Sequence, residues 1–193
     1  MVSTTLDFLD SYPSVIYYPN GDRYAGQVHI SSNSTIVPHG YGTMTKANGE
    51  TYTGYFYEGL RHGQGQSYSP ATQRLYSGSY QLDQEDGYAT ITMPGINGRQ
   101  RQYAGFMQQN QRHGSGRQWE TSVDGQISCF EGVWINDQLC GQGKYIVQGI
   151  GYSQCCEGIF VNGQLEGMGA YTDMITGLRY NVLFSRGTVV QWF

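Results

Sequence analysis

The stretch "YTGYFYEGLRHGQG", from Tyr52 to Gly65, decides the fold of this chain. It places glycines between aromatic residues, at positions where a β-strand normally packs a side chain. Residues i, i+2 and i+4 of a strand point to one face, so Tyr52, Gly54 and Phe56 share a face on which the middle side chain is missing. Because glycine inside a strand often marks a close approach of backbone, this gap indicates a site where a ring lies flat over the main chain.

The pattern aromatic-x-Gly recurs along the chain at intervals of 24 to 28 residues, which predicts a repeat architecture. Nine residues after most of the motif glycines comes a second glycine, and a third usually follows two residues later. The third repeat carries Ala89 in the last of these places, and the first contains five extra residues that should form a loop. We expect the rings of one repeat to cover the glycines of its neighbour. The motif glycines are Gly26, Gly54, Gly78, Gly105, Gly132 and Gly158.

Turn residues separate these glycine positions. Asn-Gly and Asp-Gly pairs favour tight hairpin turns in which both central residues have positive φ. Connections this short exclude parallel crossovers, so the strands should run antiparallel. One set of turns precedes the motifs, and a second follows each motif glycine by four to five residues. The first set is Asn20-Gly21, Asn48-Gly49, Asn97-Gly98 and Asp124-Gly125, and the second is Glu58-Gly59, Gln109-Asn110, Asn136-Asp137 and Asn162-Gly163.

These observations predict an all-β protein. We expect an elongated, single-layer, antiparallel β-meander solenoid of about six two-stranded repeats with a C-terminal cap. The composition agrees, because 28 glycines and 17 tyrosines among 193 residues disfavour helices and suit a pleated surface. Terminal repeats of solenoids need caps. We therefore divide the chain into an N-terminal arm or cap (1–14), the solenoid (15–179) and a C-terminal capping segment (180–193).

The repeat resembles the membrane occupation and recognition nexus (MORN) repeat, over about Tyr18 to Tyr171. "YTGYFYEGLRHGQG" and "YAGFMQQNQRHGSG" are close matches, whereas "FEGVWINDQLCGQG" and "CEGIFVNGQLEGMG" lack the histidine. The resemblance implies a scaffold in a cytoskeletal, ciliary or membrane-proximal assembly, and some MORN repeats are credited with phospholipid binding. MORN repeats also precede catalytic domains in other proteins, but no such sequence is present here.

No residue pattern predicts catalysis, a cofactor or a metal site, so we expect a protein that is not an enzyme. His39, His62 and His113 precede repeat glycines one repeat apart, and repeats about 10 Å apart cannot share one metal. We expect these imidazoles to bond turn backbone. His29 lies in the irregular loop of the first repeat and supports no inference.

The four cysteines are expected to be small core thiols of a reducing compartment. A zinc site built from three of them is the weaker alternative, since no C-x-x-C spacing supports it. The cysteines are Cys129, Cys140, Cys155 and Cys156.

The charge and the terminal sequence restrict the partners. A net charge of −4 gives no overall field that attracts nucleic acid. We interpret the arginines at 99, 101, 112 and 117 as a solvated strand face. With no signal peptide or membrane span in the sequence, we expect a cytoplasmic protein.

A sheet of this kind has two faces and cannot hide every ring, so an aromatic groove is expected to bind a partner. The alternative is that these rings form the core between repeats, with the first ring of each motif mostly structural and the fifth-position ring more exposed. Three hypotheses follow: a helix or filament segment of a protein bound in the groove, a phospholipid-binding tether, and an end-to-end homodimer through the last strands. The groove candidates are Tyr24, Tyr52, Phe56, Tyr76, Tyr80, Tyr103, Phe130, Trp134 and Phe160.

Overall fold

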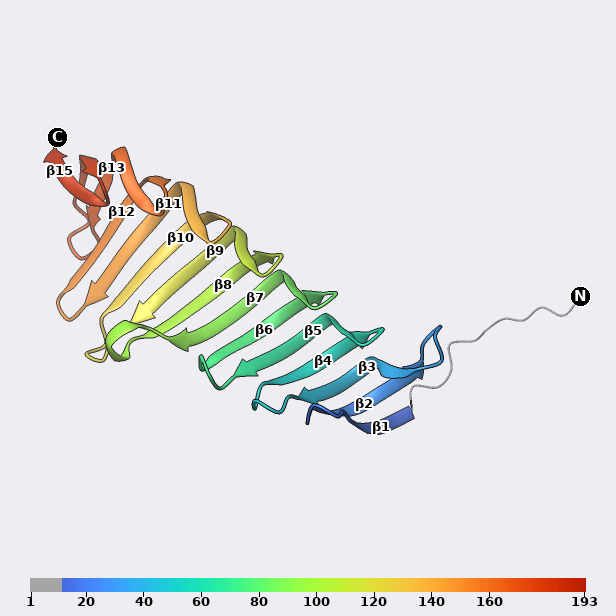
Figure 1. The fold of residues 1–193 in the computed structure, drawn as a ribbon. Coiled ribbons are helices and arrows are strands. Elements are labelled where there is room, and N and C mark those ends of the chain that lie inside the picture. The colour runs from blue at the N-terminus through green and yellow to red at the C-terminus, as the bar shows by residue number, and fades with distance from the viewer. Residues whose placement is uncertain (1–11) are drawn as a thin grey trace, which may run out of the picture.

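A computed structural model describes residues 12–193 and arranges them as one open antiparallel sheet of 15 strands (Figure 1). The strands lie in chain order from β1 to β15, and each is hydrogen-bonded to the next. Within residues 12–193 the helical structure is limited to a single 3₁₀ turn, η1 (Ile96–Gly98). The predicted all-β meander is therefore confirmed. The strands are β1 (Tyr12–Tyr17), β2 (Arg23–Ile30), β3 (Ile36–Thr45), β4 (Thr51–Tyr57), β5 (Leu60–Ser69), β6 (Arg74–Gln81), β7 (Gln84–Pro94), β8 (Gln100–Gln108), β9 (Gln111–Thr121), β10 (Ile127–Ile135), β11 (Gln138–Gly149), β12 (Tyr152–Val161), β13 (Gln164–Asp173), β14 (Arg179–Ser185) and β15 (Thr188–Trp192).

The sheet is elongated and twisted, with β1 at one end and β15 at the other (Figure 1). Each repeat is one hairpin, from β2–β3 for the first repeat to β12–β13 for the sixth. The predicted capping segment, 180–193, forms most of a further hairpin, β14–β15, which continues the sheet. The predicted arm, 1–14, lies almost entirely outside the described residues, and its last residues belong to β1.

The motif glycines make room for the first tyrosine of their own repeat. The Tyr52 hydroxyl donates a hydrogen bond to the Tyr55 carbonyl at 2.8 Å, which folds the ring over Gly54 and its partner Gly65. A Cβ on Gly65 would lie 2.5 Å from Cε2 of that ring. Tyr24 and Tyr103 cover the glycines of the first and fourth repeats in the same way. The expectation of a ring from the neighbouring repeat is wrong here, because the hydroxyl anchors the ring to its own strand.

The last repeats pack differently, because Phe130 and Cys156 stand where the earlier repeats have tyrosine. Phe130 stacks on Tyr145 with the ring centroids 4.6 Å apart. The facing glycine Gly143 is instead covered by Phe160 of the next repeat, whose ring lies 3.0 Å from the position of a Cβ. In this half of the sheet the expected ring from the neighbouring repeat is confirmed.

The tight turns after each motif close the hairpin of their own repeat and also bond to the preceding repeat. In all four predicted turns both central residues have positive φ, which is the conformation of a type I′ turn. The second turn residue also donates its N–H to the preceding repeat, as from Gly59 to the Pro38 carbonyl at 2.8 Å and from Asp137 to the Arg112 carbonyl at 3.0 Å. Leu82-Asp83 forms the same turn in the third repeat, where neither residue type had indicated it.

The other set of turns differs from the prediction. Only Asn97-Gly98 has positive φ at both residues, whereas the other three turns have it at glycine alone. At Asn48-Gly49 the Gly49 N–H donates to the Lys46 carbonyl at 2.9 Å, which makes a three-residue loop. The Asn48 side chain accepts the Glu50 N–H at 3.0 Å and so supports the wider loop.

Candidate partner-binding surface

The two faces of the sheet differ in what they leave exposed. We call the face with the motif aromatics and glycines the ring face, and the opposite one the open face. Of the nine groove candidates, eight are at most 4 % exposed and Phe130 is half-buried. These rings form the core between repeats, so the expected groove at these residues is corrected. The eight buried candidates are Tyr24, Tyr52, Phe56, Tyr76, Tyr80, Tyr103, Trp134 and Phe160.

The fifth-position rings are buried because each inserts between first rings. Phe56 meets Tyr24 of the preceding repeat at 5.1 Å and Tyr52 of its own repeat at 5.0 Å, edge to face in both cases. Tyr80 lies in the same way between Tyr52 and Tyr76, at 5.1 and 4.9 Å. The expectation that fifth-position rings are the more exposed ones is therefore wrong.

Two arginines, Arg112 and Arg61, each cover a buried ring from the solvent side. The Arg112 guanidinium lies 4.2 Å from the Trp134 ring centroid and forms an ion pair with Asp137 at 2.8 Å. The Arg112 backbone N–H donates to the same carboxylate at 3.0 Å. Arg61 repeats the arrangement two repeats earlier, 4.7 Å from the Tyr80 ring and paired with Asp83. The R-H-G part of the motif thus closes the ring face.

Burial also fixes the protonation of the first tyrosines. It raises the pKa of Tyr24 and of Tyr103 to about 12, and raises those of Tyr52 and Tyr76 as well. A hydroxyl whose pKa lies above its usual value near 10 stays protonated at neutral pH. These hydroxyls therefore remain donors to the carbonyls that hold the rings in place.

The open face carries apolar side chains that the structure leaves uncovered. Tyr41 on β3 stands directly opposite Tyr55 on β4, and Tyr88 on β7 stands opposite Phe106 on β8. The two pairs meet edge to face at 5.4 and 5.6 Å, and each of the four rings is at least 50 % exposed. Together with three exposed aliphatic side chains at matching positions they form what we call the exposed row. Its members are Tyr41, Tyr55, Tyr88, Phe106, Val133, Ile159 and Met168.

The exposed row crosses the strands and follows the long axis of the sheet. Its aromatic pairs are four strand spacings apart, or about 19 Å. Between them Gln64 donates to Ser79 at 2.7 Å and leaves a polar interval. Toward the C-terminal end the row borders a shallow hollow in which Lys144 and Arg179 both pair with Glu157, at 2.9 and 2.5 Å.

Sequence reasoning missed the exposed row, although a signal for it exists. Tyr55, Phe106, Val133 and Ile159 each follow a motif glycine by one residue, so they alternate to the other face. The residues paired with Tyr55 and Phe106 on the preceding strand are Tyr41 and Tyr88, so a second ring and not a glycine faces each of them there. A bulky side chain at that position therefore stays exposed.

The arginine cluster gives no free basic patch. Arg101 pairs with Glu120 at 2.5 Å, and Arg99 approaches the same carboxylate at 3.7 Å. Arg112 pairs with Asp137, and Arg117 donates to the sulfur of Cys129 at 2.9 Å. A solvated face was expected, but these contacts make it an ion-paired one.

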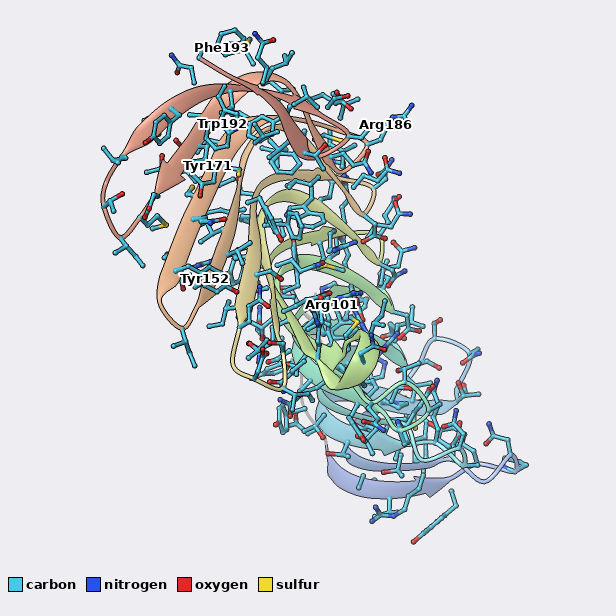
Figure 2. The ribbon with its side chains drawn as sticks, turned by 90° about the vertical axis from the view of Figure 1, so that its left-hand side faces the viewer. Arg101, Tyr152, Tyr171, Arg186, Trp192 and Phe193 are labelled. Atoms are coloured by element: carbon cyan, nitrogen blue, oxygen red, sulfur yellow. The ribbon has the colours of Figure 1, made fainter. Side chains whose placement is uncertain are left out.

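The last strand presents an edge at the end of the sheet. Figure 2 shows Trp192 and Phe193 there, with Trp192 next to Tyr171. The Trp192 and Tyr171 ring centroids are 5.0 Å apart, yet Trp192 remains half exposed. β15 pairs only with β14 among the described strands. End-to-end pairing of two copies through this edge stays a prediction.

The histidines differ from the sequence-based expectation, whereas the cysteines are the free thiols that the sequence predicts. His39 Nδ1 and His62 Nδ1 have no hydrogen-bond partner among the described residues, so the expected bonds from these atoms to turn backbone are wrong. All four cysteines are free thiols, and burial raises the pKa of Cys156 to about 11. Within residues 12–193 one group of three potential metal ligands converges, and it contains none of the thiols.

The comparisons with known proteins agree with this geometry. The model of the MORN repeat matches at residues 37–51, 52–71, 103–122, 130–146 and 156–173. It does not match the third hairpin, β6–β7, in which Ala89 takes the place of a motif glycine. A search of curated proteins finds no match. None of the described residues forms a helix of the length and apolarity that a membrane span requires. With five matching segments spread from β3 to β13 of one antiparallel meander, the chain is a MORN repeat protein.

Proposed function

We propose that the protein is a non-enzymatic scaffold that binds a segment of a partner protein along its open face. MORN repeats are a non-catalytic repeat family, and their presence suggests a scaffold or a membrane-binding role. The observation that carries the proposal is the exposed row, seven uncovered apolar side chains aligned across the sheet. We further propose that the scaffold belongs to a cytoskeletal, ciliary or membrane-proximal assembly, as the family resemblance suggests.

The form of the row indicates what kind of segment fits. Exposed apolar side chains that gather on one surface mark interaction sites, and aromatic residues dominate binding hot spots. Two aromatic pairs about 19 Å apart match the rise of about 13 residues of α-helix. We therefore propose an amphipathic helix or a filament segment that lies along the row, with its apolar anchors about two heptads apart and polar residues between them.

Affinity purification from the native cells tests this proposal. The row variant Tyr55→Ser, Tyr88→Ser, Phe106→Ser should lose the partners of the wild-type chain, because its anchors are gone while its buried rings are intact. The tip variant Val123→Ser, Ile150→Ser removes exposed apolar side chains from hairpin ends and should keep those partners. Circular dichroism of both variants verifies that the sheet is formed. Equal recovery of partners by the row variant would contradict the proposal.

A membrane tether is the alternative that the family suggests. The net charge of −4 and the ion-paired arginines argue against attraction to an anionic bilayer. Sedimentation with vesicles that contain phosphatidylserine should therefore leave the protein in the supernatant. Salt-sensitive pelleting that survives the row substitutions would replace the proposed function by a lipid-binding one.

A further inference from the structure

Two histidines and a glutamate from three different elements converge at the first repeat. His29 lies on β2, His39 on β3, and Glu58 is the first residue of the turn between β4 and β5. The Glu58 carboxylate oxygen Oε1 is 2.6 Å from His29 Nε2 and 3.7 Å from His39 Nδ1. The three potential ligand atoms all lie within 4.8 Å of one another. We propose that His29, His39 and Glu58 form a binding site for a divalent transition-metal ion of the zinc class.

The repeat geometry explains how the three residues meet. The Gly59 N–H bonds the Pro38 carbonyl at 2.8 Å, and this docks the β4–β5 turn on the start of β3, so Glu58 is placed beside His39. In the first repeat the extra residues move the hairpin turn outward to the residues after Ile30. β2 therefore continues through His29, whose ring centroid is 4.2 Å from that of His39.

The equivalent positions of the other repeats do not offer the same ligand set. His29 follows its motif glycine by three residues, as Tyr57 does in the second repeat and Gln108 in the fourth. His39 corresponds to His62 and His113, and Glu58 to Leu82 and Asn136. Only the first repeat has histidine, histidine and a carboxylate at the three places. The repeats without the set provide matched controls within the same chain.

The chemistry of the three side chains suits the ion. Zinc is bound by imidazole nitrogens and carboxylate oxygens at about 2.0–2.2 Å, and three protein ligands leave a position for water. Such bonds in a tetrahedron separate neighbouring ligand atoms by about 3.3 Å, between the two distances observed to Oε1. All three side chains are partly exposed, which leaves them room to rotate toward equal distances.

The state of the imidazoles also favours a ligand role. His29 Nε2 and His39 Nδ1 are shielded from solvent and have no hydrogen-bond partner among the described residues, since the short contact to Glu58 lacks hydrogen-bond geometry. A metal ion would supply a partner for both nitrogen atoms, because an unprotonated imidazole nitrogen is a common zinc ligand. A bound ion would join the first repeat to the second.

Equilibrium dialysis of the untagged full chain against ZnCl₂, with the metal counted by mass spectrometry, tests the site. The wild type and His113→Gln should each bind one ion per chain. Loss of an outer-shell partner alone typically costs 10–100-fold in metal affinity, so His39→Gln and Glu58→Gln should each weaken binding by at least about 100-fold. Wild-type affinity in either variant, or no binding by the wild type, would overturn the proposal. Glu58 is exposed in a turn, so Glu58→Gln is expected to fold. If His39→Gln does not fold, the zinc affinity of Glu58→Gln tests the proposal.

A further readout separates this site from the cysteines. Co²⁺ bound in place of zinc should give visible d–d bands without a thiolate-to-metal charge-transfer band. A thiolate charge-transfer band would assign the ion to the thiols and overturn the proposal.

Discussion

Gly54→Ala should lower the free energy of unfolding by about 3 kcal/mol, at the upper end of the usual cost of overpacking. A Cβ at this position would lie 2.5 Å from the Gly65 Cα, 2.6 Å from the Gln64 carbonyl oxygen and 2.6 Å from the Tyr52 hydroxyl. Two of these atoms are backbone, so the added methyl group can be accommodated only if the strands separate or the ring leaves its place. Urea unfolding followed by far-UV circular dichroism measures the loss.

Gly158→Ala is the matched control, because Gly158 holds the same motif position in the sixth repeat. There the first ring is replaced by Cys156, and the nearest atom to a new Cβ is the Leu165 Cδ2 at 3.1 Å, the end of a flexible side chain. Neither glycine has positive φ, so backbone strain does not distinguish the two substitutions. The control should cost less than about 1 kcal/mol. Equal losses in the two variants would contradict the role assigned to the tyrosine ring.

Trp134→Ala should lower the free energy of unfolding by about 3–5 kcal/mol, as expected for a large ring removed from a core. The Trp134 ring is 4 % exposed, packs edge to face against Tyr103 at 5.7 Å and lies under the Arg112 guanidinium. Its indole N–H donates a hydrogen bond to the Gly116 carbonyl at 3.1 Å. The substitution removes this donor. Urea unfolding again provides the measurement, and hydrogen exchange should place the damage in β8 to β11.

Val133→Ser is the control, at the adjacent residue on the open face. Val133 is 44 % exposed, and surface substitutions of this kind usually change stability by less than about 0.5 kcal/mol. If Val133→Ser were as damaging as Trp134→Ala, the assignment of the two faces would be reversed. The comparison also shows why substitution of Trp134 or Phe160 is a poor test of binding, since loss of partners would then follow from unfolding.

The period of the chain was sufficient to predict strand number, direction and order approximately. Recurring glycines and the type I′ pairs each constrain a local geometry, and in a meander local geometry determines the neighbours of every strand. The prediction of a two-residue turn at Asn48-Gly49 was wrong. An Asn side chain that accepts a backbone N–H supports a three-residue loop as well as a two-residue one. The length of the loop depends on side-chain hydrogen bonds that the amino-acid sequence alone does not specify.

The candidate surface was the part least accessible to sequence. Strand alternation correctly separates Tyr52 from Tyr55, but it does not say which face of a single layer is covered. Which face is covered depends on the orientation of individual side chains. The Tyr52 ring lies over the glycines of its own repeat, and the Arg61 guanidinium lies over the Tyr80 ring. The approach of His29 to Glu58 was missed for a similar reason, since it requires the inserted loop to extend β2 and the next turn to dock on β3.

Hydroxyl-radical footprinting of the native chain, read tyrosine by tyrosine by mass spectrometry, tests the division into a closed ring face and an open face most directly. Tyr41, Tyr55 and Tyr88 should be oxidised readily in the folded protein, whereas Tyr24, Tyr52, Tyr76 and Tyr103 should be protected until urea unfolds the sheet. Tyr52 and Tyr55 lie on the same strand and provide an internal comparison. Oxidation of Tyr52 as fast as Tyr55 in the native state would contradict the account.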